Sequence, residues 1–297
     1  MTTSSELVTA ESVGAQMGDA FASLDATAKT RYLELLRSIE RPDDVAMDAH
    51  PNDEGRWTLT ITTSDRLGTL SVIAGLLAAY GIDIVSVDVF TLRFSTDDGN
   101  GRRRRRSRRR PRLGQEDVRP STAILDIFDV SPSESQPGLW DRFRDDLGVL
   151  IAQLVSDGTD SAREAVIDRV ADAFRRRSQA ESQLLPMAVS VSNDESPYSR
   201  IGIRGSDTQG FLFAFANALA MLRVNVERAE IRTIGGEVED TFWVTDERGH
   251  RIESEERLSN LRVGVALIKH FTHLLPRSPD PAQALRQFHA LTRQTLS

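Results

Sequence analysis

The sequence predicts an α+β protein in which two copies of one strand–helix–strand–strand–helix unit lie in tandem between flanking helices. Three observations support this prediction. The chain is similar to itself at a fixed offset, each copy has segments in which apolar and polar residues alternate, and an apolar segment of helical length separates the first two of these. With one closing strand, each unit has the order of the ferredoxin-like βαββαβ fold.

A comparison of the chain with itself identifies the two copies. Shifted by 142 residues, the segment from Trp57 to Thr91 aligns without gaps with the segment from Ser199 to Thr233. Further along the shift is 114 residues, which aligns Asp126, Phe128 and Val130 with Asp240, Phe242 and Val244. The first copy therefore has 28 extra residues between its second and third strands, and an arginine run lies in this insertion.

The first copy contains all five elements of the unit. Ser and Asp in the turn Ser64–Gly68 are placed to cap the helix that follows, and Gly81 ends that helix. We expect the closing strand at Met187–Ser192. The other expected elements are strands at 57–63, 82–92 and 123–130 and helices at 69–80 and 139–156.

The second copy repeats this order. We expect strands at 224–233 and 238–245, joined by a tight hairpin turn at Ile234–Glu237, and a helix at 255–271. No closing strand is identified for this copy.

Four segments follow from these elements. Residues 1–50 form an N-terminal helical segment with a helix at 26–39 that docks onto the sheets, and residues 51–193 form the first domain. This domain includes the arginine-rich insertion at about 95–120 and a helical spacer at 160–180. Residues 194–276 form the second domain, and residues 277–297 form a C-terminal helix that starts at Pro281, as helices favour.

Composition excludes several classes of protein. The chain has no cysteine, so disulfides, thiol nucleophiles and cysteine-bound metals are absent. The longest uncharged stretch, Leu67–Ile82, is shorter than the roughly 20 apolar residues of a membrane-spanning helix. Residues 1–12 contain no Lys or Arg, so a signal peptide is not predicted. We expect a cytoplasmic protein.

The charge is unevenly distributed. Nine arginines lie between Arg102 and Arg112, and the net charge of -7 becomes -16 when these nine are left out. The run could bind a polyanion, an acidic partner or the acidic surface of the protein itself. It has no aromatic residues on which bases could stack, so a solvated loop is favoured and nucleic-acid binding is not expected.

The loops that precede the first helix of each copy carry a family resemblance. Residues 65–70, Asp-Arg-Leu-Gly-Thr-Leu, resemble the first-loop motif Asp-Arg-Pro-Gly-Leu-Leu of the ACT domain, with Leu67 in place of proline. The second loop, 207–212, departs further. Segments 229–233 and 238–246 are similar to the tandem ACT region of bacterial PII uridylyltransferases, and the resemblance covers roughly residues 56–272. Residues 271–276 resemble ACT-bearing proteins of the glutamine synthetase adenylyltransferase type more weakly.

The resemblance implies an amino-acid-sensing regulatory module of nitrogen metabolism, with glutamine as the favoured ligand. Backbone amides at a glycine-containing turn and helix start would bind the α-carboxylate, and Asp83 or Asn225 would hold an amino or amide group. We expect the first loop, with Asp83 nearby, to be the better site, because Phe211 fills space in the second. The candidate ligand-binding residues are Asp65, Leu67, Gly68, Thr69, Leu70 and Asp83 in the first copy and Asp207, Gln209, Gly210, Phe211 and Asn225 in the second.

The same resemblance raises the question of catalysis. Nucleotidyltransferases of this type need a Gly-Ser turn followed by an Asp-x-Asp pair that holds metal ions, and the chain contains no Asp-x-Asp. His270 and His273 have no third ligand nearby in sequence, so we predict no metal site, no cofactor and no catalytic residue. We expect the regulatory part or partner of a nucleotidyltransferase, joined in cis or in trans, with a possible homodimer through the ACT sheets. The alternative is a structural interaction module that binds no metabolite.

Overall fold

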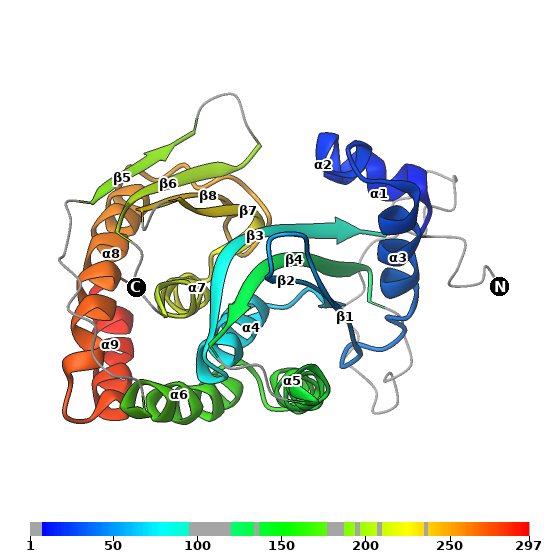
Figure 1. The fold of residues 1–297 in the computed structure, drawn as a ribbon. Coiled ribbons are helices and arrows are strands. Elements are labelled where there is room, and N and C mark those ends of the chain that lie inside the picture. Colours follow the sequence, from blue (N-terminus) through cyan, green and yellow to red (C-terminus); the bar gives the residue numbers. More distant parts are fainter. Residues whose placement is uncertain are drawn as a thin grey trace.

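A single eight-stranded antiparallel sheet with helices on both faces forms the centre of the molecule (Figure 1). The computed structural model describes residues 8–94, 120–133, 137–176, 187–193, 197–206, 210–234 and 237–296. The strand order is β1-β2-β4-β3-β7-β8-β6-β5. The predicted α+β class is therefore confirmed, and the arrangement is consistent with two units of the expected kind.

The elements of the first half lie within two residues of their predicted positions. Gly81 has a positive φ and follows the first helix, as expected. The elements are β2 (Trp57–Ser64), α4 (Thr69–Ala79), β3 (Ile82–Arg93), β4 (Thr122–Pro132) and α5 (Leu139–Ser156).

The second half repeats this order. Its elements are β6 (Ser199–Ser206), α7 (Phe211–Met221), β7 (Asn225–Ile234), β8 (Glu237–Thr245) and α8 (Glu255–Leu274). The register of β7 and β8 pairs Ile234 with Glu237. The hairpin glycines predicted between them, Gly235 and Gly236, lie outside the described residues, as does the insertion at 95–119.

The flanking segments supply the remaining elements. Helices α1 (Ala10–Met17), α2 (Asp19–Ala22) and α3 (Ala26–Arg37) precede the first unit, and a strand, β1 (Val45–Pro51), follows them. Between the units lie α6 (Thr159–Arg176) and β5 (Ala188–Ser192). After the second unit come a short 3-10 turn, η2 (Leu275–Arg277), and α9 (Pro281–Leu296).

The closing strands are the main correction to the predicted topology. The segment Met187–Ser192 does not close the first unit, because β5 pairs with β6 of the second unit. The first unit is closed by β1, which pairs with β2, so the N-terminal segment is not only helical. Each closing strand thus precedes its unit in the chain. Both are edge strands, and sequence periodicity does not tell which sheet edge an isolated strand will join.

The two units join through β3 and β7. Their antiparallel register places Asp88 opposite Glu230, and these are equivalent residues of the repeat. A pseudo-twofold axis therefore passes between the units at this pair. Helices α4 and α7 pack beside each other on one face of the sheet (Figure 1). The two sheets thus form one continuous sheet.

The sheet has a different cover on each face. The inward side chains of both units form one core with α4 to α8. On the opposite face, apolar residues of α1 to α3 cover the outer side of β3 and β4, where Phe90, Leu92 and Leu125 are buried. In the part of the chain that the structure describes, no helix has the length and apolar character needed to cross a membrane.

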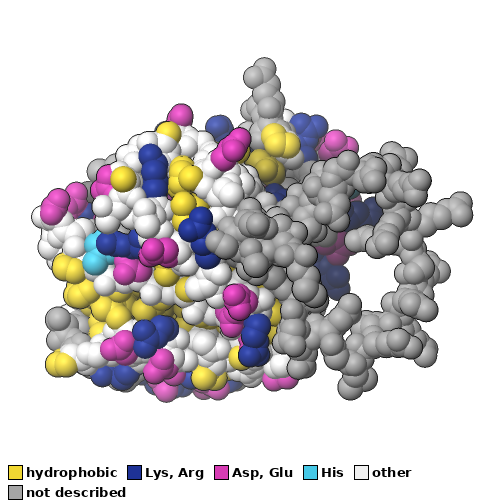
Figure 2. Space-filling model, turned by 90° about the vertical axis from the view of Figure 1, so that its right-hand side faces the viewer, with side chains coloured by type: hydrophobic (Ala, Val, Ile, Leu, Met, Phe, Trp, Pro, Cys, Tyr) yellow, Lys and Arg dark blue, Asp and Glu magenta, His cyan; other side chains and the backbone are white. Residues whose placement is uncertain are grey.

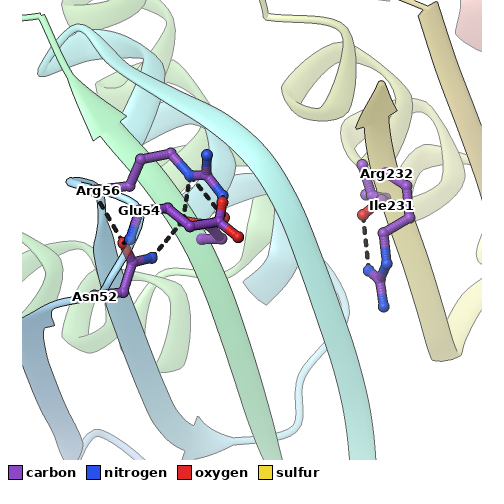
Figure 3. Close-up of polar contacts among 6 residues, drawn as sticks. Asn52, Glu54, Arg56, Ile231 and Arg232 are labelled. Carbon is purple, nitrogen blue, oxygen red and sulfur yellow. Dashed lines mark hydrogen bonds and ion pairs between the residues drawn. The ribbon is translucent and has the colours of Figure 1, made fainter. Parts of the chain in front are cut away.

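Polar contacts fasten the hairpin of β1 and β2 to β4. Arg56 Nε donates to Asp129 Oδ1 at 2.9 Å, and Asn52 Nδ2 donates to the same oxygen at 3.0 Å (Figure 3). On β7, Arg232 Nη1 donates to the backbone oxygen of Ile231 at 2.8 Å. On the described part of the face in Figure 2, acidic and basic side chains are interspersed.

Candidate functional site

Two glycines begin the helices that follow the first strand of each unit. Gly68 precedes α4 with φ +97°, and Gly210 precedes α7 with φ +72°, a conformation that glycine adopts without strain. Among the described residues no side chain caps either helix, so the predicted capping of α4 by Ser64 or Asp65 is wrong. At α4 the amide of Thr69 donates to the backbone oxygen of Arg66 at 3.1 Å, so an acceptor that is not a capping side chain would bind the amides that follow Thr69.

Helix α6 packs against both glycines. A Cβ added to Gly68 would lie 2.8 Å from Cγ2 of Thr159, and one added to Gly210 would lie 3.0 Å from Cζ of Phe174. Thr159 Oγ1 also donates a hydrogen bond to the backbone oxygen of Leu67 at 3.1 Å. The segment predicted as a spacer thus packs across both units and contacts the turn of each one.

The first loop forms one wall of a pocket between the two units. This first pocket has a volume of about 40 Å³, which holds only a few water molecules. The opposite wall comes from the second unit, from the end of α7 and the start of β7. The lining residues are Asp65 to Ser71, Val89, Ile124 and Asp126 from the first unit and Ala216, Ala220, Val224, Asn225 and Val226 from the second.

The described end of the second loop, from Gly210 onward, forms one wall of a larger pocket on the other side of the α4–α7 contact. This second pocket has a volume of about 330 Å³, within the usual range of small-molecule sites. Its opposite wall comes from the end of α4 and the start of β3. The lining residues are Gly210 to Phe213, Ile231, Thr233, Val238 and Asp240 from the second unit and Ala74, Ala78, Ile82, Asp83 and Ile84 from the first.

The two pockets lie at equivalent positions of the repeat. Each residue that lines the first pocket from the second unit is the repeat equivalent of one that lines the second pocket from the first unit. Asn225 corresponds to Asp83 in this way, and Asp126 corresponds to Asp240. Side-by-side packing about a pseudo-twofold axis generates both pockets, so each needs both units.

This symmetry changes how the predicted residues are grouped. Asn225 lies at the first loop, and Asp83 lies at the second, whereas the sequence grouped Asp83 with the first loop. The start of β7 lies beside the loop of the first unit, and the start of β3 lies beside the loop of the second unit. Asn225 Nδ2 donates to the backbone oxygen of Asp246 at 3.1 Å, which fixes its side-chain amide beside the first pocket.

The remaining predicted residues divide between the pockets. Leu67, Gly68, Thr69 and Leu70 line the first pocket with Asp65. Phe211 lines the second, is 5% exposed, and stacks on Phe215 with ring centroids 5.6 Å apart. Asp207 and Gln209 lie outside the described residues. The expectation that the first loop binds better stays a prediction, while the volumes favour the second pocket.

Two carboxyl groups in the first pocket are protonated more readily than usual. Burial raises the pKa of Asp65 to about 6, the nearby Glu227 contributes to the rise, and Arg93 opposes it. Burial and the charge of Asp65 raise the pKa of Asp126 well above its ordinary value. Removal from water disfavours the charged form of each group, so both carboxyls of this wall release their protons at a higher pH than an exposed aspartate does.

An ion pair joins the units next to these carboxyls. Arg93 on β3 pairs with Glu227 on β7, and Glu227 Oε1 accepts a hydrogen bond of 2.9 Å from Thr245 Oγ1. Gln16 Nε2 in α1 donates to the backbone oxygen of Arg93 at 3.1 Å. The N-terminal helices therefore connect to the strand that forms this ion pair.

Asp126 and Asp240 were not among the predicted site residues, although the repeat had aligned them. A signal for both was present in the sequence. On β4 the inward positions are Ile124, Asp126, Phe128 and Val130, so one aspartate interrupts an otherwise apolar face. An acidic residue at an inward strand position in both copies could have been identified from periodicity and repeat together.

Comparison with known proteins places the chain near one group of enzymes. No protein-family model matches it. Relatives with distant similarity are bifunctional uridylyltransferase/uridylyl-removing enzymes. The enzyme of Nitrobacter hamburgensis is 27% identical over 246 residues, which cover 80% of this chain and 23% of the relative. The enzyme of Rhodospirillum rubrum is 26% identical over 263 residues, which cover 87% of this chain and 24% of the relative. The enzyme of Azospirillum brasilense is 25% identical over 244 residues, which cover 81% of this chain and 23% of the relative.

The chain thus spans less than a quarter of the length of these relatives. The predicted relation to uridylyltransferases is confirmed at the level of distant similarity over most of the chain.

Proposed function

We propose that this chain is an amino-acid-sensing module of two ACT domains, with glutamine as its favoured ligand, and that it regulates a nucleotidyltransferase of nitrogen metabolism. The observation that carries this proposal is the repeated pocket. On one wall each copy has a helix start that no described side chain caps, and on the opposite wall a polar side chain from the other unit, Asn225 or Asp83.

The two walls suit the two ends of an amino acid. Backbone amides at the start of α4 or α7 carry partial positive charge and favour a carboxylate. Carboxyl and amide side chains at the opposite wall favour an ammonium group or a side-chain amide. The larger second pocket admits a ligand of this size as it stands, whereas the first pocket must open. Because one wall of each pocket belongs to the first unit and the other wall to the second, a ligand that bridges the walls would stabilise one relative position of the units.

The relatives supply the regulatory context of the proposal. Their names describe enzymes that attach and remove uridylyl groups, and this chain aligns with under a quarter of their length. We propose that a catalytic domain, in cis or in trans, receives the signal from the bridged units. The chemical basis for glutamine is that its side-chain amide can both donate to a carboxylate and accept from an asparagine.

Isothermal titration calorimetry with the twenty amino acids tests this function. We expect saturable binding of glutamine, at up to two sites per chain, and weaker or no binding of amino acids without a side-chain amide. The specificity control is glutamate, which has nearly the same shape but adds a negative charge next to acidic walls. If none of the twenty amino acids binds, the sensing function is rejected.

That outcome would favour the interaction module instead. The small volume of the first pocket and the packing of α6 over both glycine turns are the observations on its side. An interaction module would bind a nucleotidyltransferase catalytic domain with an affinity that no amino acid changes.

A further inference from the structure

An aspartate lies at the middle of the inward face in each half of the sheet. Asp126 on β4 pairs in register with Ile61 of β2 and with Val89 of β3, both of which are buried and apolar. Asp240 on β8 pairs with the buried Ile203 of β6. Asp126 is 0% exposed and Asp240 is 3% exposed. Both carboxyls are therefore placed where a sheet normally holds Val, Ile or Leu.

Such a position is unfavourable for a carboxyl group. Asp126 is buried, and neither of its oxygens has a hydrogen-bond partner among the described residues. A buried polar group without a partner costs roughly 1–3 kcal/mol in proteins, and an ionised one costs more. An apolar residue at position 126 would remove this cost, so packing alone does not explain the aspartate.

The internal repeat indicates that the aspartate has a use. The loops of the two copies have diverged, with Thr69 in one and Phe211 at the equivalent position of the other. The aspartate is nevertheless present in both copies. Asp126 and Asp240 share one feature of their surroundings, because each lines the pocket formed by its own loop and the other unit.

We infer that Asp126 and Asp240 bind the ammonium group of the ligand, one in each pocket. The inference rests on the proposed function and narrows its ligand class. A carboxylate at the helix start and an ammonium group at the sheet require a zwitterion, so the sites bind α-amino acids more tightly than the corresponding acids without the amino group. Binding of an ammonium group by a carboxyl is strong only when the carboxyl is ionised.

The surroundings of Asp126 make this binding proton-linked. Asp65 on the loop and Glu227 on β7 add negative charge around the first pocket, and Arg93 on β3 opposes them. Burial and the charge of Asp65 therefore raise the pKa of Asp126 in the free protein well above its ordinary value. When the ammonium group binds, the carboxyl loses its proton to the buffer and the carboxylate pairs with the ligand cation. Up to one proton is released for each first pocket filled, and no bond of the ligand changes.

Calorimetry of the whole chain with glutamine, in two buffers of different ionisation enthalpy at one near-neutral pH, measures this proton. We expect the apparent enthalpy to depend on the buffer and to report release of up to about one proton per first pocket filled. Asp126→Asn and Asp240→Asn should each weaken binding in their pocket by about 10- to 100-fold, the range for a hydrogen bond to a charged group. Asp126→Asn should also reduce the buffer dependence, and Asp65 would account for any that remains.

A ligand comparison tests the inference in the parent protein without any variant. The analogue of glutamine that lacks the α-amino group should bind about 10- to 100-fold more weakly than glutamine, with no proton released. The matched control is Asp129→Asn, on the same strand as Asp126 but bonded to Arg56 and Asn52 outside both pockets. This variant should bind glutamine as the parent does.

The outcomes separate the inference from the function. If glutamine binds but neither aspartate variant nor the analogue differs from the reference, the inference is wrong and the sensing function stands. If the parent binds no amino acid, both are rejected. Should Asp126→Asn fail to fold cooperatively, Asp240→Asn and the analogue still decide the result.

Discussion

Asp65 has an unusual environment for a residue at the edge of a turn. It lies on the first loop, beside the buried Asp126 and close to Glu227, and burial raises its pKa to about 6 from about 3.8. In the folded protein this group therefore holds its proton over a pH range in which the unfolded chain has already released it. The free energy of unfolding depends on pH for this reason.

The first prediction concerns this dependence. Below pH about 4 the carboxyl is protonated in both states, and between pH about 4 and 6 only the folded state keeps the proton. The contribution of Asp65 to the free energy of unfolding therefore falls as pH rises through this interval and is constant above it. Asp65→Asn should remove this fall, which urea denaturation at a series of pH values would measure.

The exposed Asp53 provides the control for this measurement. Asp53→Asn should follow the parent curve at each pH. If the free energy of unfolding of Asp65→Asn ran parallel to that of the parent over the whole pH series, Asp65 would have the same pKa in the folded and unfolded states, and the prediction would be wrong.

The second prediction concerns Gly68 and its contact with α6. Gly68→Ala places a Cβ against Thr159 and puts an L-residue in the left-handed region, so it should lower the free energy of unfolding by more than about 2 kcal/mol. Gly249→Ala carries only the backbone cost of about 1–2 kcal/mol, because a Cβ there has nothing within 4 Å. Chemical denaturation measures the loss of unfolding free energy in both variants, and the difference between the two losses gives the steric cost at Gly68.

A double variant identifies the clashing atom. Thr159→Ser removes the Cγ2 atom but keeps the hydroxyl that donates to Leu67. When combined with Gly68→Ala it should recover part of the lost stability. Equal losses at Gly68 and Gly249 would contradict the close packing of α6 on the turn.

At the scale of elements, α4 is central because it has neighbours on several sides. Every residue of it from Thr69 to Ala78 is buried. This fits the prediction from its sequence, which is apolar around most of the helix rather than along one stripe. Its glycine, Gly75, faces the side chains of Val166 in α6 and Phe213 in α7. The helix contacts both neighbours closely at this one position.

The third prediction follows from this contact. A Cβ on Gly75 would lie 2.2 Å from Val166 Cγ1 and 2.8 Å from Phe213 Cδ2. Gly75→Ala should therefore lower the free energy of unfolding by about 1–3 kcal/mol, despite the higher helix propensity of alanine. Denaturation by urea measures the change.

The same substitution in α5 is its matched control. A Cβ on Gly148 has nothing within 4 Å, so Gly148→Ala should raise the stability by up to about 1 kcal/mol through helix propensity. If Gly75→Ala also stabilises the protein, then α4, α6 and α7 do not pack as closely as described.

At the scale of the molecule, contacts on several layers hold the two units together. The β3–β7 ladder joins the sheets, and α4 and α7 pack beneath it. Helix α9 of the second half lies against α6 (Figure 1), where Arg286 Nε lies 3.0 Å from Glu164 Oε2. Phe271 and Phe288 stack with centroids 4.0 Å apart and fasten α8 to α9.

The fourth prediction tests this union. A specific protease site introduced at residues 181–183, between α6 and β5, would cut the chain into its two halves. The fragments should elute together in size-exclusion chromatography under native conditions and separate only in denaturant. Separate elution after the cut alone would contradict the continuous sheet, since the covalent link would then be what holds the units together.

Local sequence pattern determined the helices and strands of the two repeated units, but not β1, which precedes the first one. Alternation along β2 and β4, the apolar segment of α4 and the glycine that follows it depend only on residues close in the chain, so their positions were predicted within two residues. The internal repeat determined more, because equivalent sequences adopt equivalent folds. It also contained the alignment of Asp126 with Asp240, which indicates where the two pockets correspond.

The tertiary structure alone decided which residues meet. An edge strand such as β5 can extend a sheet on either side, and only its pairing with β6 assigns it to the second unit. Likewise, Asn225 reaches the first loop because β3 and β7 pair antiparallel about a pseudo-twofold axis, which carries the start of each strand to the opposite unit. Such contacts join residues far apart in the chain, and their free energy comes from surfaces that exist only after both units have folded.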